Sequence, residues 1–251
     1  MIFIKDTKIE PESVPDIPQG SVEQASLAQL AASNIKFDYA SQEQLLFELN
    51  VRGQTVTAAK DLDRSGMAFA IFRKSRCNPD FWNRTNEGGF RLKKGASPGE
   101  AITDIYEHGR KYATECATAM VIVYYRALLV VWGPETFNRI FPKIELMNWH
   151  HLDRLLREIG LMRKFPLYLP GDRLYFANPD VDPMTPQWQG ENVIDLNGKL
   201  YYGHGVGIND ADTIIRALNK NRIENADESA YLMDAAGRPD YNKLFRASQS
   251  R

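Results

Sequence analysis

The sequence predicts an α+β fold in which one buried helix packs on an antiparallel sheet. Three observations support this class: a long apolar helix expected from Thr114 to Gly133, a β-hairpin signal at Asn197-Gly198, and a chain that otherwise alternates capped helices with short β-rich runs. The 251 residues are 43% hydrophobic, which is enough to bury a sizeable core. We therefore expect a central helix on a sheet, with added helices around it.

The charge balance and the cysteine content restrict the class of protein. Thirty-one basic residues against 32 acidic ones give a net charge of −1, which leaves no electrostatic footprint for nucleic acid or an anionic membrane. Two cysteines allow one disulfide at most, and the first residues lack the apolar core of a secretory signal. We expect synthesis in a reducing cytosol and a single domain over residues 36–251, after an N-terminal extension over residues 1–35.

Helix-start signals mark the first half of the chain. Capping boxes begin at Ser21 and Ser41, so a helix is expected after each. Residues 67–92 consist of short β-rich runs around an Asn-Glu-Gly-Gly turn, which predicts a strand followed by a hairpin. The pair Ser97-Pro98 is typical of another helix start.

The second half of the chain contains three further expected segments. Residues 151–160 have the spacing of an amphipathic helix, and residues 171–178 are typical of a strand. The loop at residues 178–190 carries three prolines and two aspartates without the spacing of a calcium loop. We therefore interpret this loop as a rigid surface connection and expect no metal site.

Cys116 lies near the start of the expected central helix. Thr114 is the expected N-cap, Glu115 suits the positive end of the helix dipole, and Gly133 closes the far end. Free N–H groups in a first turn favour a thiolate and can lower the pKa of a thiol from about 8.5 to roughly 3.5–7.5. Cys116 is therefore a candidate nucleophile, although a buried cysteine can also pack as a small hydrophobic residue. Arg126 interrupts the apolar run, which favours a core helix over a membrane span.

The hairpin around Asn197-Gly198 supplies candidate partners for the thiol. If these residues form a two-residue turn, counting outward places Glu191 opposite His204, with Cβ atoms about 4.5–5.5 Å apart on one face. A carboxylate there can fix the imidazole tautomer or itself take a proton. The same two residues could instead form a surface ion pair worth under about 1 kcal/mol. Together with Cys116, they match the plan of papain-like cysteine enzymes.

Several separated segments of the chain resemble one family. They include TECATAMVIVYY around Cys116, QWQGENVI around Glu191 and HGVGI around His204, and the likeness extends over residues 35–246. These segments resemble the protein-glutamine gamma-glutamyltransferase (transglutaminase) of bacterial endospores. The resemblance implies a papain-like core and a calcium-independent acyl transfer, without a cofactor, that cross-links spore-coat proteins. It also implies an enzyme made in the mother-cell cytoplasm that acts at the spore coat.

The resemblance also implies a role for each residue of the candidate site. Cys116 would attack the carboxamide of a substrate glutamine, ammonia would leave, and a lysine amine would take the acyl group to give an isopeptide bond. Glu191 would be the main proton-transfer partner, with Glu115 as a substitute and His204 in support.

Aromatic residues match the walls of that family's substrate tunnel: Phe69, Trp149 and Trp188. A dry aromatic passage would let lysine, rather than water, reach the thioester, and it would favour the neutral amine. Two other functions stay open from the residues alone. One is a cysteine amidase or peptidase that uses water as the acceptor, and the other is a non-catalytic building block of the spore coat.

Overall fold

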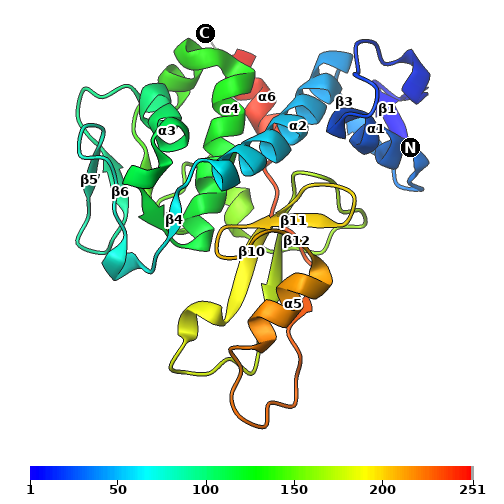
Figure 1. Cartoon of the computed structure of the whole chain (residues 1–251). Helices are drawn as coiled ribbons and strands as arrows, with labels where there is room; N and C mark the ends of the chain where they lie inside the picture. The colour runs from blue at the N-terminus through cyan, green and yellow to red at the C-terminus, as the bar shows by residue number, and fades with distance from the viewer. Residues whose placement is uncertain (250–251) are drawn as a thin grey trace.

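The computed structural model describes residues 1–249 as a layer of helices packed on a five-stranded antiparallel sheet (Figure 1). This arrangement confirms the predicted α+β class. The last two residues of the domain predicted over 36–251 lie outside the described residues. The helices are α1 (Val22–Ala32), α2 (Gln42–Arg64), α3 (Pro98–Glu107), α4 (Cys116–Ile140), α5 (Ala211–Asn219) and α6 (Tyr241–Gln249). The main sheet has the order β12 (Gly207–Asp210), β11 (Leu200–Gly203), β10 (Gly190–Asp195), β9 (Arg173–Ala177) and β13 (Tyr231–Leu232).

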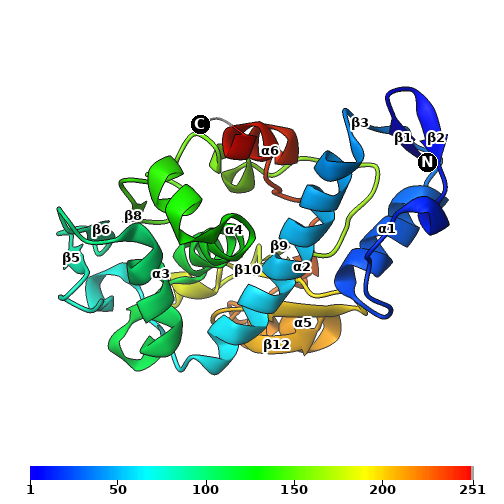
Figure 2. The same ribbon diagram turned by 90° about the horizontal axis from the view of Figure 1, so that it is seen from above.

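The chain also forms three smaller sheets, two of which lie on opposite sides of the helices in Figure 2. They consist of β2 (Thr7–Ile9), β1 (Ile2–Ile4) and β3 (Phe37–Tyr39); of β4 (Ala68–Phe69) and β7 (Ala113–Thr114); and of β5 (Trp82–Arg84), β6 (Phe90–Leu92) and β8 (Glu145–Leu146). The serines expected to cap the first two helices do so, because Ser21 and Ser41 each accept a hydrogen bond from the backbone N–H three residues later.

Helix α4 is the central core element. It is long and apolar enough to cross a membrane by length and composition, but 67% of its most apolar window is buried inside the protein. Gly133 has φ 75°, a conformation that favours glycine, and Pro134 follows it. The helix therefore changes direction where the sequence predicts that its apolar part ends.

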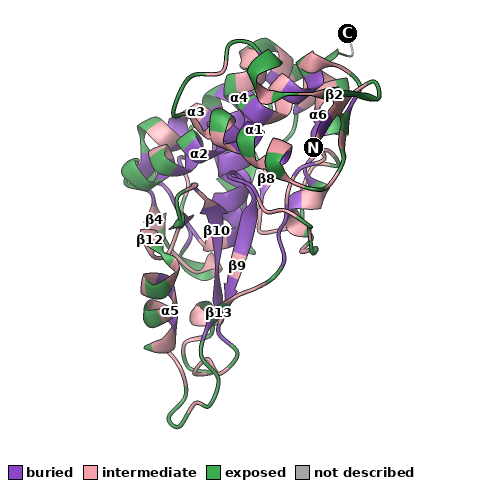
Figure 3. Cartoon of the chain, turned by 90° about the vertical axis from the view of Figure 1, so that its right-hand side faces the viewer, coloured by how far each residue is buried: buried purple, intermediate pink, exposed green. Residues whose placement is uncertain are grey.

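Helix α4 packs directly against the main sheet. Ile194 of β10 and Tyr202 of β11 belong to the same buried cluster as residues 119–125 of the helix, and Figure 3 shows the purple of buried residues along β10 and β9. The Tyr124 hydroxyl of the helix donates a hydrogen bond to the carbonyl of Gly171, just before β9 (2.8 Å). This contact fixes the helix relative to the first residues of that strand.

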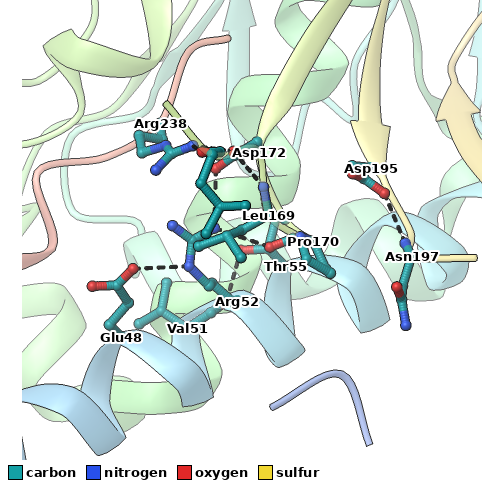
Figure 4. A network of polar contacts seen from close by, with 12 residues as sticks. Glu48, Val51, Arg52, Thr55, Leu169, Pro170, Asp172, Asp195, Asn197 and Arg238 are labelled. Atoms are coloured by element: carbon teal, nitrogen blue, oxygen red, sulfur yellow. Dashed lines mark hydrogen bonds and ion pairs between the residues drawn. The ribbon is translucent and has the colours of Figure 1, made fainter. Parts of the chain in front are cut away.

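A buried ionic network holds the start of β9 against helix α2 (Figure 4). Arg52 of α2 is fully buried, and its Nη1 donates to Asp172 Oδ1 at 3.0 Å while its Nε donates to Glu48 Oε1 at 2.9 Å. Arg238 donates to the other carboxylate oxygen of Asp172. The charges compensate one another, which buried ionised groups require. Arg173, the next residue along the chain, is therefore held in place by its neighbour.

The hairpin that joins β10 to β11 has a register one residue away from the predicted one. Leu196 donates to the carbonyl of Leu200 (2.9 Å), so the loop consists of three residues rather than Asn197-Gly198 alone. All three have positive φ, including Lys199 at 62°. Because Val193 therefore pairs with Gly203, the alternation places Gly205, and not His204, across from Glu191.

The prediction of an amphipathic helix over residues 151–160 is wrong. Only Arg157–Gly160 is helical there, as a single 3-10 turn. The carbonyl of Ile159 accepts a hydrogen bond from Arg173 Nε at 2.7 Å, a tertiary contact that the local spacing of apolar residues does not reveal. A local turn at Asp153 takes the place of the helix start, because the Leu155 N–H donates to Asp153 Oδ1 (2.9 Å) and the Leu156 N–H donates to the Asp153 carbonyl (2.9 Å).

Residues 1–35 pack on the rest of the chain through a separate core cluster. Strand β1 pairs in parallel with β3, and Leu27 and Leu30 of α1 share buried contacts with Leu45 and Leu49 of α2. The boundary at residue 35 stays a prediction, since β1 and β3 lie on either side of it within one small sheet.

Candidate active site

Cys116 is the first residue of helix α4 and directly follows a capping carboxylate. The N-cap is Glu115 and not Thr114, which is the buried last residue of β7. The Glu115 oxygens accept hydrogen bonds from the backbone N–H groups of Ala117 (2.6 Å) and Thr118 (2.7 Å). Its charged side chain thereby satisfies two N–H groups at once, which a threonine hydroxyl does not.

The surroundings of the thiol raise its pKa, so the lowered pKa expected from its helix position is wrong. Burial disfavours the thiolate most, and the charges of Glu191 and Glu115 add to this effect. Glu115 also occupies the N–H groups that would have stabilised a thiolate. The resting form of Cys116 is therefore the neutral thiol.

Glu191 lies on β10 and is 3% exposed. Burial raises its pKa to about 8, the charge of Glu115 contributes, and a hydrogen bond from the Gly205 N–H to Oε1 (3.0 Å) opposes the rise. No other hydrogen bond to this carboxyl group is formed within residues 1–249. A deprotonated Glu191 therefore has one oxygen available to accept a proton.

The start of α4 and the start of β10 thus bring three of the predicted site residues together. The charges of both glutamates act on the Cys116 thiol, and the thiol in turn interacts with the Glu115 carboxyl group. Burial raises the pKa of Glu115 as well, against the hydrogen bonds that it accepts from Thr118 and Ala117. The cluster combines a nucleophile with two carboxyl groups whose pKa values are raised by burial, and Glu191, with a pKa of about 8, can take up a proton near neutral pH.

His204 is not the direct partner of Glu191 that the predicted hairpin register implied. Its Nε2 lies 3.1 Å from the carbonyl of Ala68 and its Nδ1 lies 3.0 Å from the Tyr202 hydroxyl. Because a carbonyl can only accept, Nε2 carries the hydrogen and Tyr202 donates to Nδ1. Burial lowers the pKa of His204 to about 4, so the ring is neutral and both of its nitrogens are occupied. The ring also lies 6.3 Å from that of Phe69, which it supports.

The thiol faces a cavity of about 900 Å³ with mainly apolar walls. Phe69 and Trp149, two of the three expected wall residues, line it together with Cys116. Within residues 1–249 no group of three histidine, cysteine, aspartate or glutamate side chains could hold a metal ion.

Trp188 does not line this cavity, which corrects the third expected wall position. Its ring packs instead on a separate core cluster that contains Leu174 and Phe176. The short 3-10 turn Pro186–Trp188 explains the difference, because successive residues of such a turn face different directions and Pro186 and Gln187 are the two that line the cavity. The loop interpreted as a plain surface connection therefore forms one wall of the candidate site.

Two polar residues of the site were missed in the sequence. Asn192 Nδ2 donates to Cys116 Sγ at 3.4 Å, and Asn192 Oδ1 accepts from Arg173 Nη1 at 2.6 Å. Successive side chains of a strand point to opposite faces, so Asn192 was expected on the face opposite Glu191 and not near the same thiol. For Arg173, the one available signal was a charge at the start of an otherwise apolar strand.

Comparisons with known proteins agree on one family. The family model described as "Protein-glutamine gamma-glutamyltransferase" matches residues 1–248. The protein of that name from Bacillus mycoides (strain KBAB4) is 41% identical over 96% of this chain and 86% of its own length, and that from Bacillus cereus (strain 03BB102) is 40% identical over 100% and 90%. Among solved structures, the transglutaminase from Geobacillus stearothermophilus, without its C-terminal extension, is similar with a TM-score of 0.76. It is 48% identical and covers 83% of this chain and 97% of that chain.

The raised pKa of Glu191 predicts a change in stability with pH. Between the ordinary value of 4.5 and about 8 the folded state binds more protons than the unfolded state, so the free energy of unfolding falls as pH rises through this window. Glu191→Gln removes the ionisation. At pH 9 we expect its Tm to exceed that of the wild type by at least about 4 °C, as roughly 2 kcal/mol would give, with a smaller difference at pH 5.

Thermal unfolding of both proteins at the two pH values measures this effect. Glu224→Gln, at an exposed position, is the matched control and should show the same difference from the wild type at both pH values. A Glu191→Gln difference that does not grow with pH would contradict a protonated Glu191 in the folded state.

Proposed function

Because this chain belongs to the protein-glutamine gamma-glutamyltransferase family, we propose that it joins protein glutamines to lysine amines through a thioester on Cys116. Its relatives carry the name of this acyltransferase, and the enzyme class follows from the family. The observation that carries the proposed mechanism is a half-buried thiol on the wall of a mainly apolar cavity, where the charges of two carboxyl groups act on it. The alternative of a non-catalytic building block does not agree with this family.

The first half of the proposed reaction forms the thioester. The Glu191 carboxylate takes the thiol proton while Sγ attacks the carboxamide carbon of a substrate glutamine. The carbon–nitrogen bond then breaks, the proton passes to the nitrogen, and ammonia leaves. The raised pKa of the Cys116 thiol favours proton transfer together with the attack, and not before it.

The second half transfers the acyl group to lysine. A neutral amine attacks the thioester carbon, Sγ leaves as a thiolate, and the amine proton returns to it through Glu191. The product is an ε-(γ-glutamyl)lysine bond. Apolar walls such as Phe69 and Trp149 support this step, because they limit access of water and favour the uncharged amine.

The proposed site of action is the spore coat, after synthesis in the mother-cell cytoplasm, and the proposed substrates are coat proteins that bear glutamine and lysine. The resemblance of the sequence to the endospore enzymes supports this part of the proposal. Spores that carry Cys116→Ala in place of the wild type should contain fewer ε-(γ-glutamyl)lysine bonds in hydrolysed coat material. Equal amounts in both spores would contradict the coat as the site of action.

Cys116→Ala should abolish the incorporation of a fluorescent primary amine into a glutamine-rich protein, because no thioester can form. Cys77→Ala is the matched control and should keep most of the activity, since Cys77 does not line the cavity. The assay is run with a calcium chelator, because the proposal includes calcium independence. Absence of incorporation by the wild type would contradict the proposal.

The same assay separates transfer from hydrolysis. A transferase releases ammonia faster when amine is added, since the amine accelerates removal of the acyl group. Ammonia release that is unaffected by amine would identify a cysteine amidase instead.

The two glutamates should differ in their effect on the pH profile. Activity of the wild type should rise with pH up to about 8, as Glu191 becomes ionised and able to take the thiol proton. Glu191→Gln should lose this rise and most of the activity, by roughly 10²–10⁴-fold. Glu115→Gln should keep the rise with a smaller loss, because both of its oxygens already accept hydrogen bonds at the helix start.

The double variant should be almost inactive if the glutamates substitute for each other in part. Initial rates of amine incorporation between pH 6 and 9.5 measure all three variants. An equal loss in both single variants would argue against Glu191 as the main proton acceptor.

A further inference from the structure

Arg173 is a buried cation that forms no ion pair with a carboxylate of residues 1–249. It is 2% exposed, and its side-chain hydrogen bonds go to the Ile159 carbonyl and the Asn192 amide. Its Nη2 atom is buried and has no hydrogen-bond partner within residues 1–249. Burial lowers its pKa to about 10, so the guanidinium still carries its charge near neutral pH. A buried charge without an ion partner is costly and is usually retained for function.

The position of Arg173 is tightly determined. Its guanidinium lies 4.5 Å from the centre of the Trp149 ring, and adjacent Asp172 is bound by two other arginines. A Cβ atom on Gly237 would come within 2.9 Å of the guanidinium, so the backbone of Gly237 also packs closely against it. The guanidinium therefore has little freedom to turn away from Asn192.

Asn192 connects this cation to the thiol. Strand β10 pairs with β9 so that Asn192 faces Tyr175, which makes Asn192 and Arg173 diagonal neighbours on one face of the sheet. Arg173 Nη1 donates to Oδ1 at 2.6 Å, which fixes the amide with its Nδ2 hydrogens directed at Cys116 Sγ, 3.4 Å away. A rotated amide would direct an oxygen at the sulfur and another donor at the guanidinium.

We propose that Arg173 is a positioning residue for the nucleophile: it holds the Asn192 amide so that Nδ2 donates to Cys116 Sγ and stabilises the thiolate. This inference rests on the proposed role of Cys116. When the thiol proton passes to the Glu191 carboxylate, one negative charge moves from the carboxylate to Sγ. The sulfur then gains a stronger hydrogen bond from Asn192, and the charge of Arg173 is compensated through the same amide.

Groups on three elements act on the ionisation of Cys116. Glu115 on its own helix and Glu191 on β10 both oppose a thiolate, whereas the Asn192 amide favours it. On β9, burial is the main cause that lowers the pKa of Arg173 and raises that of Tyr175 to about 12, so the Tyr175 hydroxyl stays protonated. An ionised Cys116 opposes the first shift and adds to the second. Arg173 is the cation of this set, so its loss should raise the pKa of the Cys116 thiol.

The test measures the alkylation of Cys116 by iodoacetamide from pH 6 to 9.5, without any substrate. All proteins carry Cys77→Ala, so each chain has one thiol. Arg173→Met removes the charge and the hydrogen bond, Asn192→Ala removes the donor to Sγ, and Arg173→Lys keeps the charge. Arg126→Met is the matched control, because that guanidinium also lies over an aromatic ring, 5.1 Å from the centre of Tyr106, but lines a different cavity.

At pH 8 we expect Arg173→Met and Asn192→Ala to alkylate at least about tenfold more slowly, since each unit of thiol pKa changes the thiolate fraction tenfold. Arg173→Lys should recover part of the rate, and Arg126→Met should match the parent. The double variant Arg173→Met/Asn192→Ala should be no slower than the slower single variant, because both changes remove the same hydrogen bond to sulfur.

A folded Arg173→Met that has the parent profile would overturn the inference, and so would additive losses in the double variant. If Arg173→Met does not fold, Arg173→Lys and Asn192→Ala decide the outcome, and parent profiles for both would overturn it. Because alkylation needs no glutamine or lysine, its result is independent of whether the proposed cross-linking activity is observed.

Discussion

The packing of helix α4 against strands β9 and β10 is the contact on which the site depends. The helix supplies Cys116 as its first residue, and β10 supplies Glu191 and Asn192 as its second and third residues. Cys116 and Asn192 are 76 positions apart in the chain, so only the tertiary fold brings them together. The Tyr124–Gly171 hydrogen bond and the ionic network around Asp172 fix β9 on the same helix layer. A small shift of either element would separate the thiol from both partners.

Burial determines the electrostatics of this site. It raises the pKa of the Cys116 thiol and of the Glu191 carboxyl group and lowers that of His204, so all three tend to the uncharged form near neutral pH. A neutral carboxyl group close to a neutral thiol is stable at rest. The same low-dielectric surroundings strengthen each hydrogen bond formed when charge develops during reaction. Stability of the resting state and electrostatic control of the reaction therefore come from one physical cause.

Local signals in the sequence predicted the elements more successfully than the contacts between them. The caps at Ser21 and Ser41 and the central helix could be predicted because each depends on neighbouring residues. The hairpin register failed by one position, since Lys199 adopts a positive φ that the Asn-Gly signal does not reveal. Arg173 and Asn192 could not be assigned, because their roles depend on pairing between strands and on the position of a helix far away in sequence.

The protonated resting thiol also has a consequence for the chemical durability of the protein. Peroxide and other oxidants convert a cysteine to its sulfenic acid by reaction with the thiolate, so the rate follows the thiolate fraction and the exposure of sulfur. Cys116 combines a raised pKa with a half-buried position on the wall of a cavity. Its surroundings thus slow oxidation of the sulfur at rest. Under the proposed mechanism the thiolate forms only as the Glu191 carboxylate takes the proton during attack on a bound acyl donor.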